Sequence, residues 1–183
     1  SGDGALEVRV LSFGFKYGAP MEADLVFDVR FLPNPYYVPE LRAHTGLDQG
    51  VRDYVFGGGQ ADEFMKRLGD LIAWLLPRYV EEGKTALVIG VGCTGGHHRS
   101  VAIAHSLAEL IRTLGYPVSE SVRVYKKSAD GTLTASDLSA LPATVTGGYL
   151  SYHLNAARQV DLIIFTDTTG DGLTYGRIDP TST

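Results

Sequence analysis

Apolar and polar residues alternate near the start of the chain. Leu6, Val8 and Val10 are apolar, whereas Glu7 and Arg9 between them are charged. This two-residue period predicts a half-buried β-strand over residues 6–12. Apolar runs over residues 25–31 and 84–91 predict two further strands.

Two other segments carry apolar residues at three- and four-residue steps, which predicts amphipathic helices. The first spans residues 61–80, and the second begins at Arg99 and ends near Gly115, a residue suited to a helix C-cap. Strands that alternate with helices in this way are typical of an α/β fold. We therefore expect a mixed sheet flanked by helices.

The last third of the chain has weaker patterns. Short apolar runs on either side of residues 129–131 predict a hairpin, residues 147–158 a short helix, and residues 162–165 a strand. We expect one α/β domain over residues 5–183, with a core of residues 5–118. The extension of residues 119–183 adds to the same domain or mediates self-association.

Candidate chemistry concentrates between the third strand and the second helix. A loop rich in glycine, from Gly92 to His98, leads into a helix that begins at Arg99. The free N–H groups and positive dipole end of a helix N-terminus favour an anion. Arg99 adds a fork of donors, and Thr94 and Ser100 add hydroxyls. The loop therefore predicts a phosphate site, and the alternative is a tight turn with a solvated arginine.

The same loop allows an enzymatic alternative. Cys93 and Arg99 have the spacing of the cysteine-dependent phosphatase loop, in which a thiolate attacks phosphorus. However, Gly92 stands where such enzymes usually carry histidine, and no aspartate can be assigned as the leaving-group acid. Elsewhere, Lys16 is a candidate anion contact, and Arg42 is either a second one or a surface arginine.

Composition narrows the function classes. The formal net charge is −5, which argues against a broadly basic surface for nucleic acid. Cys93 is the only cysteine, so an internal disulfide is excluded. No run of about 18 apolar residues is present, and we expect a soluble, cytoplasmic protein. Asp167 and Asp171 lack the spacing of a cation loop, and we expect no metal and no cofactor.

Three motifs, in this order and spacing, resemble the C-terminal domain of RapZ-type RNase adapter proteins. They are SFGFKYG, ADLVFDVRFLPNPYYVPELRAHTGLD and IGVGCTGGHHRSVAIA, within residues 7–118. The resemblance implies a non-enzymatic regulator similar in architecture to the sugar-phosphate-binding part of phosphofructokinases. It also implies binding of glucosamine-6-phosphate and, in some bacteria, of small regulatory RNAs that are presented to an RNase.

The resemblance also implies a set of ligand residues. Matched by motif, they are Arg30, Thr94, Gly95, Gly96, His98, Arg99 and Ser100, with Lys16 and Asn34 in addition. Some family members place a histidine where this chain has Tyr36, whose phenol carries no cation at neutral pH.

Two family features are absent or reduced. The chain has no Walker A loop, so we do not expect nucleotide binding to be inherited from the family. The basic C-terminal segment of the family is reduced to Lys126 and Lys127, which weakens the case for RNA. We expect a regulatory binding module for a phosphorylated metabolite that forms a homo-oligomer and binds no membrane. An RNA or RNase partner stays open as a separate hypothesis.

Overall fold

The computed structural model describes residues 6–42, 44–122, 125–127, 133–135, 148–154, 160–167 and 174–178. Its central sheet contains β1 (Glu7–Gly14), β2 (Leu25–Asp28), β3 (Ala86–Cys93) and β4 (Val118–Val122), in the order β2-β3-β1-β4. The three strands expected from the sequence are confirmed, although β2 is shorter than residues 25–31. Every pairing in this sheet is parallel, so the expectation of a mixed sheet is wrong. Helical crossovers join β2 to β3 and β3 to β4. Each crossover returns the chain to the end of the sheet where the previous strand began, so the next strand runs in the same direction.

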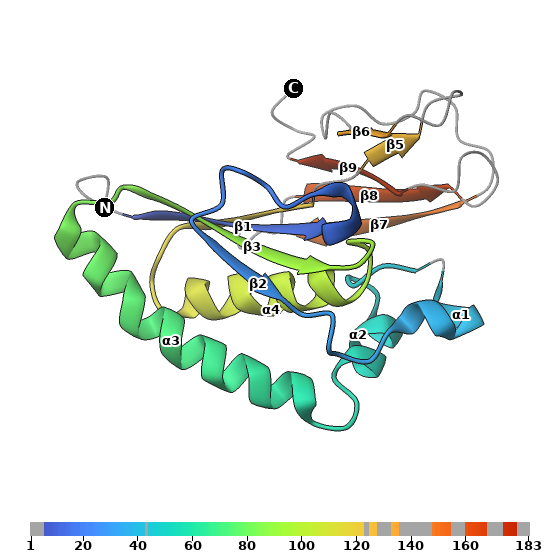
Figure 1. Cartoon of the computed structure of the whole chain (residues 1–183), viewed down its shortest axis with the longest axis horizontal. Coiled ribbons are helices and arrows are strands. Elements are labelled where there is room, and N and C mark those ends of the chain that lie inside the picture. Colours follow the sequence, from blue (N-terminus) through green and yellow to red (C-terminus); the bar gives the residue numbers. More distant parts are fainter. Residues whose placement is uncertain are drawn as a thin grey trace.

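The two expected helices are confirmed as α3 (Gln60–Glu82) and α4 (Arg99–Thr113). Both lie on one face of the central sheet (Figure 1). The crossovers from β2 to β3 and from β3 to β4 step across the sheet in the same direction. Right-handed connections of that kind place their helices on the same face.

Shorter elements lie between these. They are the 3₁₀ turns η1 (Phe15–Tyr17) and η2 (Pro35–Tyr37) and the helices α1 (Pro39–Arg42) and α2 (Gln49–Val55). The core lies between the sheet and the helices, where Val10, Ile89 and Leu107 are fully buried. Gly69 allows α3 to pack close to α4, because a Cβ atom at this position would lie 2.7 Å from the side chain of Leu110.

The C-terminal strands form two small antiparallel sheets. β5 (Tyr125–Lys127) pairs with β6 (Leu133–Ala135), and β7 (Gly148–Leu154), β8 (Val160–Asp167) and β9 (Thr174–Ile178) form the other sheet. The strand expected over residues 162–165 is confirmed. The helix expected over residues 147–158 is wrong, because Leu150, Tyr152 and Leu154 recur at the period of a strand and pair with β8.

Two expectations fall outside the described residues. These are the turn at residues 129–131 and the side chain of Asp171. The assignment of residues 5–183 to one domain stays a prediction. Among the described helices, none combines the length and the apolar character that crossing a membrane requires.

Candidate functional site

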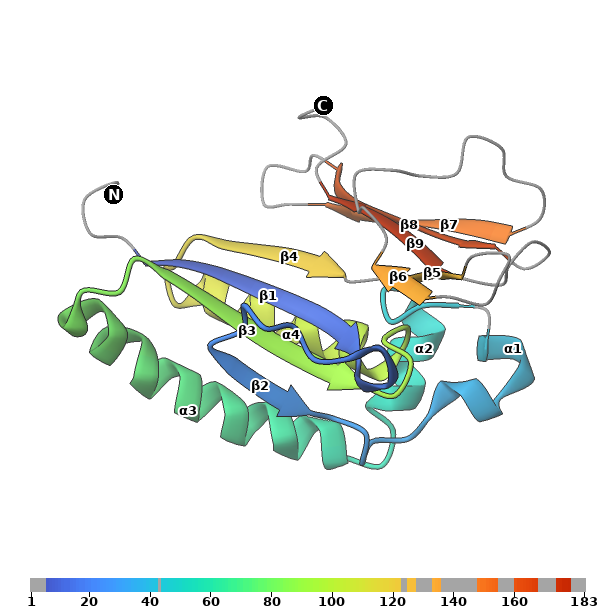
Figure 2. The ribbon, with the colours of Figure 1, turned by 45° about the horizontal axis from the view of Figure 1, so that its top comes forward.

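The carboxyl ends of three neighbouring strands bring the candidate residues together. Gly14 at the end of β1 pairs with Cys93 at the end of β3, and Asp28 at the end of β2 pairs with Gly92. The segments that follow these strands are η1, the proline-rich loop before α1, and the loop before α4, and they meet at one edge of the sheet (Figure 2). This edge is where parallel α/β sheets bind ligands.

A cavity of about 300 Å³ lies at this edge. Its lining residues are Lys16, Asn34, Tyr36, Tyr37, Cys93, Thr94, Gly95, His97, His98 and Arg99. None of these lining residues is acidic, whereas Lys16 and Arg99 are cationic. The cavity therefore favours an anion.

Arg99, the first residue of α4, is 5 % exposed. Its guanidinium donates from Nη1 to the backbone oxygens of Arg30 at 2.6 Å and Leu32 at 3.4 Å, and from Nη2 to Thr94 Oγ1 at 3.4 Å. Its Nε has no hydrogen-bond partner, and no carboxylate in the described part of the chain forms an ion pair with it. A buried guanidinium held only by neutral oxygens keeps its full charge available to an anion.

The loop before α4 is held by its own groups. Gly96 N donates to Cys93 Sγ at 3.3 Å, and Cys93 Sγ donates to Ser100 Oγ at 3.2 Å. The N-cap residue of α4, His98, makes no side-chain cap hydrogen bond to the helix. The helix N-terminus therefore keeps donors for a ligand at the cavity.

Close backbone contact fixes this loop against the end of β1. Lys16 N donates to the carbonyl oxygen of Thr94 at 3.2 Å. Gly96 has a φ of 81°, and a Cβ atom there would lie 2.7 Å from Gly14 N. A Cβ atom on Gly14 would lie 2.6 Å from the backbone of Gly95. Only glycine fits either position, so the loop has little freedom to move away from β1.

The two histidines of the loop are both held neutral by their surroundings. Burial, together with the positive charge of the neighbouring His98 and Lys16, lowers the pKa of His97 to about 4. Burial also lowers the pKa of His98, against hydrogen bonds to the backbone of Arg42 and His44. The Nε2 atom of His98 lies 2.9 Å from the carbonyl oxygen of Arg42, so it acts as the donor. His98 therefore ties the loop to α1 as well as lining the cavity.

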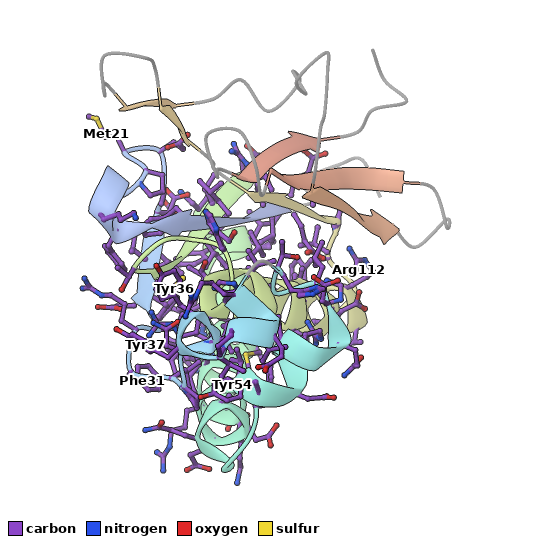
Figure 3. The ribbon with its side chains drawn as sticks, turned by 90° about the vertical axis from the view of Figure 1, so that its right-hand side faces the viewer. Met21, Phe31, Tyr36, Tyr37, Tyr54 and Arg112 are labelled. Carbon is purple, nitrogen blue, oxygen red and sulfur yellow. The ribbon has the colours of Figure 1, made fainter. Side chains whose placement is uncertain are left out.

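The proline-rich loop forms the opposite wall. The Asn34 side chain accepts a hydrogen bond from Tyr36 N at 3.1 Å, which caps η2. Tyr36 and Tyr37 are 53 % and 76 % exposed, and their rings meet edge to face with centroids 5.8 Å apart (Figure 3). The guanidinium of Arg42 stacks on Tyr36 and donates to its carbonyl oxygen at 2.7 Å. Two aromatic rings thus stand at the mouth of the cavity.

Arg30 has a different environment from Arg99. It is exposed, makes a two-pronged ion pair with Asp28 at 2.6–3.0 Å, and stacks on Phe15. This contact with Arg30 holds the pKa of Asp28 below its usual range. Arg30, Arg42, Gly96 and Ser100 were predicted as ligand residues and lie outside the cavity lining. Each of them instead contacts a residue that lines the cavity.

Sequence reasoning missed two lining residues, Tyr37 and His97. Each directly adjoins a residue that was predicted, Tyr36 or His98. A loop or 3₁₀ turn can present consecutive side chains to one space, unlike a strand, which alternates them. Their position next to a predicted residue was therefore the signal in the sequence that could have identified Tyr37 and His97.

One further polar cluster lies on α4 and β4. His105, Glu109 and Glu120 each offer a ligand atom, and these atoms lie within 4.8 Å of one another. Glu109 is paired with Arg112 at 3.0 Å, and Glu120 contacts His105 Nδ1 at 3.1 Å. These pairings account for the cluster without an ion, and none of its members lines the cavity.

A family model described as the RapZ C-terminal domain matches residues 6–126. The chain belongs to this family. The match covers the central sheet, both long helices and every residue that lines the cavity. It also extends beyond the resemblance noted from the sequence, through β4 to the start of β5.

Curated relatives agree with this assignment. A nucleotide-binding protein of Caldanaerobacter subterraneus is 60% identical over 111 residues, which are 61% of this chain and 39% of the relative. A nucleotide-binding protein of Clostridioides difficile is 57% identical over 128 residues, 70% of this chain and 43% of the relative. The chain thus spans about two-fifths of the length of these relatives.

Proposed function

We propose that this RapZ C-terminal domain is a regulatory module that binds a phosphorylated small molecule of the amino-sugar phosphate class. The observation that carries the proposal is the buried guanidinium of Arg99. It lines a cavity without acidic side chains, and the hydrogen bonds that it makes in the described part of the chain go to neutral oxygens. A phosphate oxygen is the acceptor that such a donor fits best.

The charge and the shape of the cavity both support this ligand class. Lys16 and Arg99 supply two positive charges, which match a phosphate monoester dianion. The α4 N-terminus adds backbone donors, and neutral His97 adds a polar group without charge. Tyr36, Tyr37 and Asn34 on the opposite wall offer ring faces and an amide to a sugar ring. The amino group itself is proposed from the family resemblance.

Calorimetric titration tests the proposal directly. Glucosamine-6-phosphate, glucose-6-phosphate, glucosamine and inorganic phosphate are each titrated into the wild-type chain. We expect the two sugar phosphates to bind, glucosamine to fail, and phosphate alone to bind weakly because it leaves the tyrosine wall empty. No heat from any phosphorylated ligand would contradict the proposal.

A matched pair of lysine variants separates the site from overall charge. Lys16→Ala removes a lining cation, whereas Lys84→Ala removes one paired with Asp24 and outside the cavity lining. Because Lys16 is exposed, we expect its loss to weaken sugar phosphate binding by up to about fivefold, which corresponds to up to about 1 kcal/mol. Lys84→Ala leaves the isotherm unchanged. Equal effects of the two variants would show only general electrostatic attraction.

The proposed regulation is a population shift. Arg99 donates to Thr94 on one loop and to the backbone of Arg30 and Leu32 on another, so a ligand on Arg99 alters both loops together. A partner that reads this surface, either an RNase or a small RNA, then senses the ligand. Retention of a small structured RNA at low salt, with or without the sugar phosphate, tests the RNA role. Absence of retention at low salt removes RNA as the partner.

A second function, a cysteine-dependent phosphatase, is favoured by one contact. Cys93 lines the cavity and its Sγ lies 3.2 Å from Ser100 Oγ, next to the donor Gly96 N. The cavity lining lacks a carboxylic acid to protonate a leaving group. Turnover of an aryl phosphate that disappears in Cys93→Ser, while sugar phosphate binding survives, would establish the enzyme.

A further inference from the structure

The tyrosine pair at the mouth of the cavity is unusually exposed for residues that line a binding site. Tyr37 is 76 % exposed and Tyr36 is 53 % exposed, and both line the cavity. The two rings lie on the same side of the molecule (Figure 3). An aromatic ring stabilises a fold mainly through the area that it buries. The open area of Tyr37 therefore adds little to the fold and is available to a ligand that extends out of the cavity.

The Tyr37 ring is also held in place. It meets the Tyr36 ring edge to face, with centroids 5.8 Å apart and an angle of 85° between the rings. Tyr36 is fixed in turn by Arg42, whose guanidinium lies 4.9 Å from the ring and donates to the Tyr36 carbonyl oxygen at 2.7 Å. Asn34 caps the 3₁₀ turn that carries both rings. A ligand that stacks on Tyr37 therefore meets a platform that needs little further ordering.

Positive charge extends to the same mouth. Arg42 is exposed, and among the described residues no ion pair joins it to a carboxylate. Lys16 and Arg99 already supply two cations to the cavity, which match one phosphate monoester. Arg42 is thus a third cation, beside the tyrosines, and it suits a second phosphate group.

We propose that the ligand is a nucleotide-linked amino sugar, whose diphosphate lies among Arg99, Lys16 and Arg42 and whose base stacks on Tyr37. This inference rests on the proposed function, because the sugar phosphate part occupies the same cavity. The cavity of about 300 Å³ is at the small end of the range for ligand sites, which is about 300 to 1,000 Å³. The base therefore lies outside it, on the open area of Tyr37. Every base has a π-face, so stacking accepts any of them.

Two ligands that differ only by a nucleotide test the inference. N-acetylglucosamine-1-phosphate and UDP-N-acetylglucosamine contain the same sugar, and the second adds uridine monophosphate. In calorimetric titration of the wild-type chain, we expect the nucleotide sugar to bind at least about tenfold more tightly, because of the stacked base and the second phosphate. If the sugar phosphate binds and the nucleotide sugar binds no more tightly, the inference is overturned and the proposed function stands. If neither of them binds, nor glucosamine-6-phosphate, both are overturned.

The ratio of the two dissociation constants isolates the stacking contact. Tyr37→Leu removes the ring, and we expect the advantage of the nucleotide sugar to fall by about fivefold or more. Tyr37→Phe keeps the ring and should preserve the ratio. Tyr54→Leu is the matched control, since Tyr54 is 38 % exposed and lies outside the cavity lining, and it should change neither constant. An unchanged ratio in Tyr37→Leu would overturn the placement of the base.

A base joined to phosphate also occurs in RNA, and a third ligand separates the two sources. Oligouridylate carries the same base without the sugar-linked diphosphate. At equal salt concentration, we expect it to bind more weakly than UDP-N-acetylglucosamine. Tighter binding of oligouridylate that is lost in Tyr37→Leu would overturn the inference, because the tyrosine pair would then serve RNA.

Discussion

Two arginines lie at the carboxyl end of the central sheet, Arg99 at the start of α4 and Arg30 just after β2, and their surroundings differ. Arg99 is 5 % exposed and is held by carbonyl and hydroxyl oxygens. Arg30 is exposed and is neutralised by Asp28 two residues earlier. The two residues are linked, because the Arg99 guanidinium donates to the backbone oxygen of Arg30.

This difference is the reason why we assign Arg99, and not Arg30, to the proposed anion site. A carboxylate that pairs with an arginine competes with any incoming anion, as Asp28 does at Arg30. Neutral oxygens position the Arg99 guanidinium without cancelling its charge. The segment of residues 28–32 therefore supplies both the carbonyl groups that position Arg99 and the carboxylate that neutralises Arg30. Four predictions test this contrast.

The largest expected effect is the loss of the Arg99 guanidinium. Arg99→Ala should weaken sugar phosphate binding by about 1.5–3 kcal/mol, roughly ten- to 150-fold. Arg99→Lys should give an intermediate affinity, because it keeps the charge and loses the fork of donors. Calorimetric titration measures both variants. An isotherm for Arg99→Ala like that of the wild type would contradict the pocket assignment.

Gly96→Ala disturbs the loop without changing its charge. Because φ is 81° and the added Cβ would lie 2.7 Å from Gly14 N, we expect a loss of about 1–3 kcal/mol in the free energy of unfolding. Gly95→Ala is the matched control, since a Cβ atom there meets nothing within 4 Å, and should change stability by less than about 0.5 kcal/mol. Urea unfolding measures both. Equal stability of the two variants would show that the loop can move away from β1.

Acid should destabilise the fold through His97. Its pKa is about 4 in the folded chain against an ordinary value of 6.5, so between these values the unfolded chain binds the extra proton. This contribution to stability is fully present above about pH 6.5 and is lost as the pH falls toward 4, with a slope of at most about 1.4 kcal/mol per pH unit. The difference between wild type and His97→Asn in urea unfolding isolates this slope. Parallel pH profiles would contradict the prediction.

The smallest effect is expected at Arg30. Because its guanidinium is paired with Asp28 and lies outside the cavity lining, Arg30→Ala should leave the sugar phosphate isotherm unchanged. A loss as large as that of Arg99→Ala would instead show that Arg30 contacts the ligand, as the sequence predicts. Asp28→Asn sharpens the test, because it leaves Arg30 without its carboxylate partner and should increase the affinity slightly.

The sequence by itself determined the elements of the core. The two-residue period at Leu6, Val8 and Val10 and the three- and four-residue steps over residues 61–80 predict β1 and α3, because one face of each is buried. The sequence also singled out the loop that lines the cavity, since glycines between a strand and a helix leave backbone donors at a helix N-terminus. The three quoted motifs identified the family.

Only the tertiary structure decided how these parts combine. The parallel sheet depends on where each crossover returns the chain, which is a matter of contacts between distant residues. β7 depends on its pairing with the next strand, β8. Arg30 and Arg99 are both arginines beside strand ends in the sequence. Their difference arises because Asp28 reaches one guanidinium, while folding buries the other against the carbonyl group of a residue 69 positions away in the chain. Burial and pairing set the available charge of a side chain, and both are properties of packing.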